Sequence, residues 1–197
     1  SADQMQLKDI ARKFLEKENA VKRARNVLEG EESFDENLWQ QIIEMGFTAT
    51  AIPEEYGGLG LGYLELCVIA EELGRSLAPT PFSSSVYLAT EAILNSGDDS
   101  LKQNYLPSLA NGEKIGSFAH SESNTSPTES NIQCNVSGNA LSGKKIAVVD
   151  GDISNFFVVS AKNGSNVGLY LVDASSDGVG IERQPTLDPS RSHASVI

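Results

Sequence analysis

The chain has 197 residues, of which 40% are hydrophobic and 21% are charged, and its formal net charge is −12. This composition is ordinary for a globular protein, and at about 150 residues per domain the length allows one large domain or two small ones. We expect no nucleic-acid partner, because an acidic surface repels phosphates, and no membrane partner, because no apolar run reaches the roughly 20 residues of a membrane span.

The first 112 residues have the apolar spacing of helices. Ser1 and Gln4 have the spacing of a capping box, so they begin a helix over the apolar stripe that follows. Ser33 and Glu36 repeat this spacing ahead of a second helix, which Gly46 ends.

A glycine-rich segment at residues 52–62 follows the second helix. It reads Ile-Pro-Glu-Glu-Tyr-Gly-Gly-Leu-Gly-Leu-Gly, with four glycines within six residues. Such a run cannot remain in a helix or a strand without a large entropy cost. We therefore predict a tight, ordered crossing between two helices.

Three further helices are predicted before residue 112. The third ends at Gly74, the fourth begins at Pro81 and closes at residues 95–97, and an aspartate at position 98 or 99 caps the fifth. Pro107 lies within the fifth helix. We expect it to kink or shorten that helix, because proline has no backbone N–H.

After Gly112 the predicted elements become short strands, and this change marks a domain boundary. Turn sequences such as Ser-Gly-Asn at 137–139 and Asn-Gly-Ser at 163–165 separate the strands. Strands at intervals of about ten residues are typical of an antiparallel sandwich or barrel. The predicted strands cover residues 115–120, 131–136, 140–149, 155–161, 167–172, 179–184 and 192–197.

The predicted fold class is α+β. An N-terminal all-helical bundle at residues 1–112 precedes an antiparallel β-sandwich or barrel domain at residues 113–197. Ile197 falls inside a predicted strand, which leaves an unpaired edge. We therefore expect a fragment, or a protein that is completed by something outside this chain.

Residue types that serve in catalysis occur without a catalytic arrangement. His120, Ser121 and Glu122 could supply a base, a nucleophile and an orienting group. Adjacent strand residues point to opposite faces, however, and cannot form a hydrogen-bonded relay. Lys144 and Lys145 follow a glycine at a strand start and are expected to be a solvated basic pair.

Cys67 and Cys134 have no metal-ligand spacing, so we predict no metal site and two small buried hydrophobic side chains. The polar N-terminus has no signal-peptide core. Both features favour a reducing compartment, and we expect the cytoplasm.

Four stretches, taken in order, resemble the acyl-CoA dehydrogenase family, the flavoenzymes that form a trans-2-enoyl thioester from a saturated one. Each stretch is weak alone, but their order and spacing agree, and the resemblance covers essentially the whole chain. The stretches are Ile-Pro-Glu-Glu-Tyr-Gly-Gly-Leu-Gly at 52–60 with Ala-Glu-Glu-Leu-Gly at 70–74, Tyr-Leu-Pro-Ser-Leu-Ala-Asn-Gly-Glu at 105–113, Phe-Ala-His-Ser-Glu at 118–122, and Gly-Lys-Lys-Ile-Ala-Val-Val-Asp-Gly at 143–151 with Leu-Asp-Pro-Ser-Arg at 187–191.

The resemblance implies an N-terminal helical domain and a middle β-domain, with the family's C-terminal four-helix domain absent. It also implies FAD as the cofactor, an acyl-CoA thioester as the substrate, and an oligomer with a like or a different dehydrogenase-type chain. In the family, a carboxylate base removes the α-proton while the β-hydride passes to the flavin. That base belongs to the C-terminal domain, so no catalytic residue is assigned here.

The resemblance further implies a set of cofactor-binding residues. The first three would lie along the pyrimidine edge of the flavin, and the other three fall on the family's Trp-Ile-Thr sequence beside it. They are Phe118, His120, Ser121, Ala147, Val148 and Val149. Ser126 and Pro127 fall near the family's Gly-Ser, which touches the cofactor and the pantetheine arm of the substrate.

Three departures from the family pattern favour an alternative function. Ala147 replaces an aromatic residue, Val149 replaces a hydroxyl residue, and the loop at 122–128 lacks the usual glycine turn. Similar departures occur in dehydrogenase-like subunits that pair with a second chain, some of them used on steroid-derived thioesters. The open alternatives are an FAD-dependent acyl-CoA dehydrogenase, a non-catalytic subunit that pairs with a catalytic partner chain, and a plain thioester- or protein-binding module.

Overall fold

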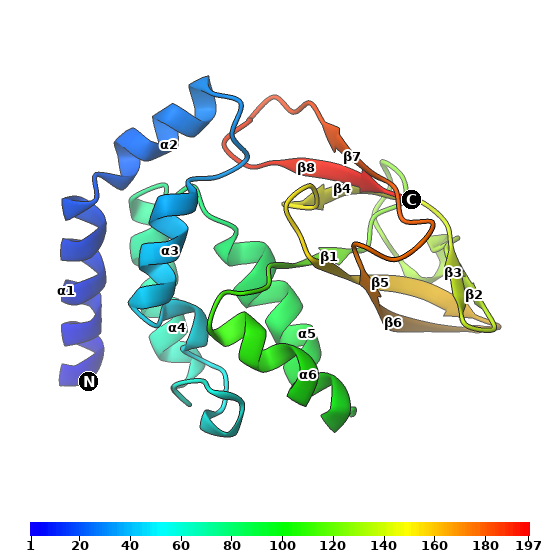
Figure 1. The fold of residues 1–197 in the computed structure, drawn as a ribbon, viewed down its shortest axis with the longest axis horizontal. Coiled ribbons are helices and arrows are strands. Elements are labelled where there is room, and N and C mark those ends of the chain that lie inside the picture. Colours follow the sequence, from blue (N-terminus) through cyan, green and yellow to red (C-terminus); the bar gives the residue numbers. More distant parts are fainter.

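Helices occupy one side of the molecule and strands the other, in the computed structural model of residues 1–197 (Figure 1). The chain forms helices up to residue 110 and strands from residue 116. The helices are α1 Ala2–Lys17, α2 Ala20–Glu29, α3 Glu36–Glu44, α4 Tyr63–Arg75, the π-helix η3 Ser83–Thr90, α5 Glu91–Leu94 and α6 Asp99–Ala110, with single 3₁₀ turns η1 Phe47–Ala49, η2 Glu54–Tyr56 and η4 Glu129–Asn131. None of them combines the length and hydrophobicity that a membrane crossing requires.

The capping box that begins α1 is confirmed, because the Ser1 hydroxyl accepts from the backbone N–H of Gln4 at 3.2 Å. The second predicted box is wrong. Asp35 caps α3 instead, and its carboxylate accepts from the backbone N–H of Leu38 at 2.8 Å. Ser33 turns away and donates its hydroxyl hydrogen to Asp152.

Two helical features differ from the prediction. Helix α2 was not predicted; Asn19, with φ of 53°, turns the chain out of α1, and small buried residues at Ala20 and Ala24 face the core. Helix α6 continues through Pro107 to Ala110 and is not shortened. Pro107 is exposed, so the carbonyl group that loses its N–H partner there faces water.

The glycine-rich segment is an ordered crossing, as predicted. Backbone N–H groups of Gly58, Gly60 and Leu61 donate to the carbonyls of Pro53, Ile52 and Thr50. A β-carbon at Gly58 would lie 1.9 Å from the Ile52 oxygen. This close approach of two backbone segments explains the glycine.

The strands form one five-stranded and one three-stranded sheet, and neither closes into a barrel. In the larger sheet β5 lies between β1 and β6, pairing parallel with β1 and antiparallel with β6 over eight residues. The smaller sheet has the order β4-β8-β7. The strands are β1 Gly116–Ala119, β2 Asn135–Ser137, β3 Ala140–Ser142, β4 Lys145–Val149, β5 Phe156–Asn163, β6 Asn166–Asp173, β7 Ile181–Gln184 and β8 His193–Val196.

The single strand predicted at 140–149 is two strands in different sheets. Gly143 breaks it, with φ of 150° and with Cys134 so close that a β-carbon would lie 2.2 Å from its Sγ atom. Cys134 is buried as predicted, whereas Cys67 is exposed, contrary to the prediction. Cys67 lies on the outer side of α4, where no other element covers it.

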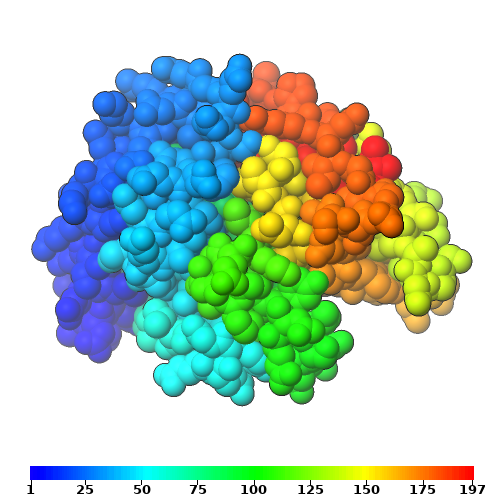
Figure 2. All heavy atoms as spheres, in the orientation of Figure 1, coloured from blue at the N-terminus to red at the C-terminus, as the bar shows by residue number.

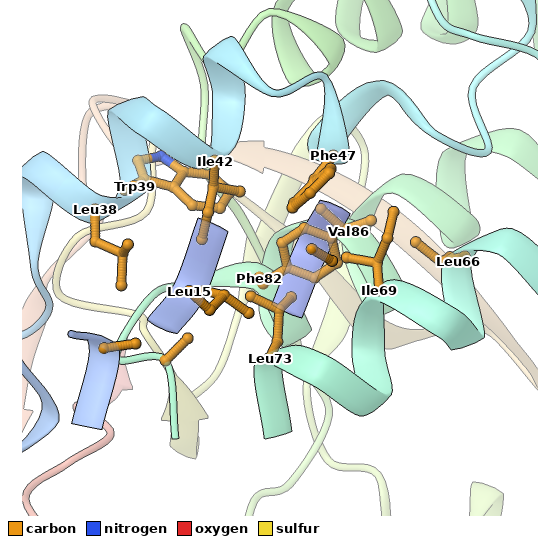
Figure 3. Close-up of a cluster of buried hydrophobic side chains, with 13 residues drawn as sticks. Leu15, Leu38, Trp39, Ile42, Phe47, Leu66, Ile69, Leu73, Phe82 and Val86 are labelled. Carbon is orange, nitrogen blue, oxygen red and sulfur yellow. The ribbon is translucent and has the colours of Figure 1, made fainter. Parts of the chain in front are cut away.

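Three groups of buried apolar side chains hold the molecule together. The largest lies among the helices, where Trp39 and Phe82 meet edge to face with ring centroids 6.4 Å apart (Figure 3). The second combines helix residues such as Ala89 and Leu106 with Phe156 of β5. Because this cluster spans both regions, the helices and the larger sheet share a core, and Figure 2 shows them in contact.

Polar contacts also connect the two regions. The Ser84 hydroxyl of η3 donates to the carboxylate of Asp150 at 2.6 Å. Arg191, from the fourth resembling stretch, donates to the Thr80 carbonyl and lies 3.9 Å from the same carboxylate. Residues of that stretch therefore join the strands to the helices.

Candidate functional site

The two segments predicted to flank a cofactor lie side by side. The backbone N–H of Ile146 donates to the Ser121 carbonyl at 2.8 Å. Further along the same two segments, the Ser117 hydroxyl donates to the Val149 carbonyl at 2.6 Å. The end of β1 and the strand β4, about 25 residues apart in sequence, are therefore neighbours, and their exposed and half-buried residues make up the candidate surface.

Phe118 and His120 present a half-buried aromatic strip on this surface. They share a face of β1 because strand residues alternate, and their ring centroids are 5.8 Å apart at a 40° tilt. Phe118 packs against the cluster that joins the helices to β5, whereas Ala119 points into the opposite, fully buried cluster. The strip thus faces the side of the sheet on which the helices lie.

The three predicted residues of β4 have different environments. Ala147 is exposed and has φ of 52°, within the register shift between Lys145 and Val148. Val148 is 1% exposed and packs in the core, and Val149 is half-buried. The side chain of Ala147 is free to meet a ligand, whereas Val148 can offer only its backbone.

Lys145 is buried, which contradicts the predicted solvated pair; only Lys144 is exposed. The Lys145 side chain is 2% exposed, and its ammonium group donates to Glu122 Oε1 at 2.7 Å. It also donates to Ser160 Oγ at 3.0 Å and to the carbonyl of His120 at 3.2 Å. All three N–H bonds of the ammonium therefore have acceptors.

Glu122 is held as a carboxylate by this arrangement. Burial alone would raise its pKa, but the hydrogen bond from Lys145 and those from the backbone N–H groups of Gln133 and Cys134 outweigh burial and lower the pKa to about 2. A carboxylate so fully paired is a poor proton acceptor. Glu122 is therefore a charged residue with a structural role.

His120, Ser121 and Glu122 form no relay, as the alternation of strand residues predicted. His120 instead pairs across the sheet with Ser160 of β5, at 2.8 Å from Nδ1 to Oγ. Neither the contact of Ser160 with His120 nor the burial of Lys145 was predicted from the sequence. A lone serine within the apolar β5 run, directly after Val-Val, was the available signal.

Ser126 and Pro127 are exposed in the loop between β1 and β2. One hydrogen bond involves these two residues: the Asn131 side chain donates to the Ser126 carbonyl at 3.1 Å. A polar hollow of about 620 Å³ lies beside this loop, lined by residues that include Glu122, Thr125 and Lys144. Ser126 and Pro127 lie in the loop that borders this hollow, but they are not among its lining residues.

An apolar hollow of about 550 Å³ lies elsewhere, among α2, α4 and the segment before η3. Leu28, Leu73 and Phe82 are among its lining residues, and Arg191 lies at its edge. It contains none of the predicted site residues. Neither hollow is lined by the predicted flavin-binding residues, so the candidate site is the surface formed by β1 and β4.

Comparisons with known proteins point to one family. The family model described as "Acyl-CoA dehydrogenase, N-terminal domain" matches residues 1–113. The chain is 32% identical over 179 residues to the mitochondrial isovaleryl-CoA dehydrogenase of Arabidopsis thaliana, covering 87% of this chain and 43% of that protein. The chain thus spans less than half the length of this relative.

Solved structures agree in fold. The ChsE4-ChsE5 complex from Mycobacterium tuberculosis is similar at a TM-score of 0.85 and 27% identity, over all of this chain and 53% of that one. The Tcur3481-Tcur3483 steroid ACAD is similar at 0.86 and 29%, over all of this chain and 55% of that one. An acyl-CoA dehydrogenase complexed with FAD from Bacillus anthracis has a TM-score of 0.89 at 23% identity, over all of this chain and 35% of that one.

Proposed function

Because this chain belongs to the acyl-CoA dehydrogenase family, we propose that it forms the helical and β-sheet parts of an FAD-dependent oxidoreductase that acts on the Cα–Cβ bond of an acyl-CoA thioester. One observation carries this proposal. The segments 118–121 and 147–149, which the resemblance predicts to flank the flavin, lie side by side and are connected by hydrogen bonds to the carbonyls of Ser121 and Val149.

The residues of this surface fit a flat aromatic cofactor. Phe118 and His120 offer half-buried rings on which a planar group can pack, and Ser121 offers a hydroxyl. Ala147 is a small exposed residue of the neighbouring strand β4. When bound, FAD would supply the hydride acceptor, and the presence of FAD in the Bacillus anthracis enzyme supports this choice.

The role of this chain is to bind and position. Phe118, His120 and Ser121 would hold the ring edge, while the backbone of Val148 and the side chains of Ala147 and Val149 would form the adjoining wall. Ser126 and Pro127 would contact the pantetheine arm from their exposed loop. We assign no catalytic base within this chain, since Glu122 is fully paired with Lys145 and two backbone donors.

The test is FAD binding by the purified chain, followed by flavin absorbance and by the quenching of flavin fluorescence. We expect FAD to bind, and Ala147→Glu to abolish binding by placing bulk and charge on the surface. Ala140→Glu is the matched control, because Ala140 is an exposed alanine in β3, outside the site. A chain that never takes up FAD, or equal binding by both variants, contradicts the proposal.

A second function is a non-catalytic subunit that pairs with a catalytic dehydrogenase chain. The similarity to two proteins named as pairs, ChsE4-ChsE5 and Tcur3481-Tcur3483, supports it, as do Ala147 and Val149 in place of the family's aromatic and hydroxyl residues. Co-expression with a neighbouring dehydrogenase chain should then yield a stable complex and restore flavin content. Oxidation of an acyl-CoA by this protein in the absence of any partner chain would refute this alternative.

We also propose oligomerisation with a like or different chain of the family and a cytoplasmic location. The named pairs support the first. The two free cysteines support the second, since thiols persist in reducing compartments.

A further inference from the structure

His120 has two ring nitrogens with different surroundings. Nδ1 lies 2.8 Å from the hydroxyl oxygen of Ser160. The parallel pairing of Ala119 with Val159 brings the next residue of each strand side by side, so this contact follows from the sheet register. Nε2 has no hydrogen-bond partner within the chain, and the side chain is half-buried on the candidate site.

The direction of the Ser160 hydrogen bond follows from Lys145. An ammonium group can only donate, so Ser160 Oγ must accept from Lys145 Nζ at 3.0 Å. Ser160 is 1% exposed, and its hydroxyl oxygen contacts only Lys145 and His120. Its single hydrogen can therefore go only to His120 Nδ1.

The opposite tautomer would leave a buried group unsatisfied. With the proton on Nδ1, both His120 and Lys145 would donate to Ser160, and the hydroxyl hydrogen would have no acceptor. Buried donors without partners cost free energy, so the network selects the ring with its proton on Nε2. Lys145 itself cannot turn away, because Glu122 and the His120 carbonyl hold its other two N–H bonds.

We propose that Lys145 and Ser160 fix the neutral ring of His120 in the Nε2–H tautomer, and that this N–H is a positioned hydrogen-bond donor for a ligand on the Phe118 surface. Lys145 and Ser160 are positioning residues, because they act through His120. The ligand must present an acceptor oxygen or nitrogen. The identity of the acceptor rests on the proposed function: it is either an edge atom of the flavin ring or the carbonyl of the thioester.

The tautomer can be read without any cofactor by ¹⁵N NMR of the histidine rings. The chain contains two histidines, so His120→Gln assigns the spectrum and His193 serves as an internal reference. We expect Nδ1 of His120 to resonate as an unprotonated nitrogen and Nε2 as a protonated one. Intermediate shifts at both nitrogens of the unmodified protein would show exchanging tautomers and would overturn the proposal.

Variants of the serine test the cause. Ser160→Ala should move both nitrogens toward the intermediate shifts, and Ser160→Thr should restore the original pattern because it keeps the hydroxyl. Ser76→Ala is the matched control, since Ser76 is a buried serine that donates to the Glu72 carbonyl of α4 and has no hydrogen bond to His120, Ser160 or Lys145. An unchanged His120 spectrum in folded Ser160→Ala would overturn the role of Ser160.

Ligand binding identifies the acceptor. FAD is titrated into the unmodified chain and into His120→Phe, first alone and then with a CoA thioester present. A loss of about three- to tenfold in affinity for FAD alone, the usual worth of one hydrogen bond, assigns the acceptor to the flavin, and a loss confined to the thioester assigns it to the substrate. Equal affinities in both titrations would overturn the donor role; a chain that binds no FAD refutes the proposed function, while the NMR result stands on its own.

Discussion

At the scale of single residues, the buried ammonium group of Lys145 sets the electrostatics of the candidate site. Three acceptors surround it, and only one of them, Glu122, carries a charge. Removing one member of such a pair leaves the other charge buried and uncompensated. The pair therefore makes a specific contribution to stability that can be measured against pH.

We predict that Glu122→Gln lowers the free energy of unfolding by about 3 kcal/mol at neutral pH. The pKa of Glu122 is about 2 in the folded chain, below its ordinary value of 4.5. As the pH falls, the unfolded chain therefore takes up this proton at a higher pH than the folded chain does. The stabilisation is complete above about pH 4.5 and is lost as the pH falls toward 2.

Urea unfolding at a series of pH values measures this effect. Glu122→Gln should remove part of the acid dependence between these two pH values. Glu129→Gln, a change at an exposed carboxylate without a hydrogen-bond partner, is the control. Parallel stability curves for the unmodified chain and Glu122→Gln would contradict the prediction.

Gly57 and Gly58 allow a second residue-scale prediction, because they are adjacent and are needed for different reasons. Gly57 has φ of 80° with open space around it, so Gly57→Ala should cost only the backbone strain, about 1 kcal/mol. A β-carbon at Gly58 would lie 1.9 Å from the Ile52 oxygen and 2.6 Å from its β-carbon. Gly58→Ala should therefore cost about 3 kcal/mol or more; equal losses in thermal unfolding would show that the crossing is not tightly packed.

At the scale of elements, Glu72 joins α1 to α4. Its side chain is fully buried, and Arg12 of α1 donates to both of its oxygens, at 3.0 and 2.7 Å. Arg75 adds a third contact at 3.2 Å. The hydrogen bond from Arg12 outweighs burial and lowers the pKa of Glu72, so the carboxylate is charged where it lies.

We predict that Glu72→Gln destabilises the chain by about 2 kcal/mol, because one charge-assisted bidentate contact is lost. Glu71→Gln is the matched control. Glu71 is the preceding residue of the same helix, its side chain is 60% exposed, and its pair with Lys8 should contribute no more than about 0.5 kcal/mol. Denaturant midpoints of the two variants measure the difference, and a similar loss in both would refute the assigned role of Glu72.

At the scale of the whole molecule, the helical and strand regions share a core. We propose that residues 1–112 and 113–197 are two domains that unfold as one cooperative unit, because Phe156 and Val158 of β5 pack among helix residues. Tyr105 of α6 meets Phe156 edge to face at 4.9 Å. Neither region can lose this contact without exposing apolar surface of the other.

We predict that Phe156→Ala lowers the free energy of unfolding by about 3–5 kcal/mol, since the side chain is fully buried. Fluorescence of Trp39, the one tryptophan, reports on the helices, and hydrogen exchange of β5 and β6 amides reports on the strands. Both signals should change at the same, lowered denaturant concentration. Leu187→Ala, at an exposed leucine, is the control, and two separate transitions would contradict cooperative unfolding.

Local patterns predicted most of the elements. The apolar run of β5 and the Asn-Gly-Ser turn that follows it are recognisable within a few residues, and the eight positions at which β5 pairs with β6 confirm this hairpin. The predicted proximity of His120 and Ala147 came from the resemblance, and the structure places their strands side by side. Helix α2 escaped prediction because two of its three buried residues, Ala20 and Ala24, are small alanines, and Val27 alone gives only a weak apolar pattern.

The sequence by itself determined the order of helices and strands, the glycine crossing and the family resemblance, because these depend on residues that are near one another in the chain. The tertiary structure alone decided the burial of Lys145, the partner of His120 and the break at Gly143. Each depends on atoms supplied by distant residues: Lys145 is buried only because Glu122 and Ser160, 23 and 15 positions away, present acceptors to it. A lysine next to another lysine has no local property that distinguishes a solvated charge from one enclosed by the fold.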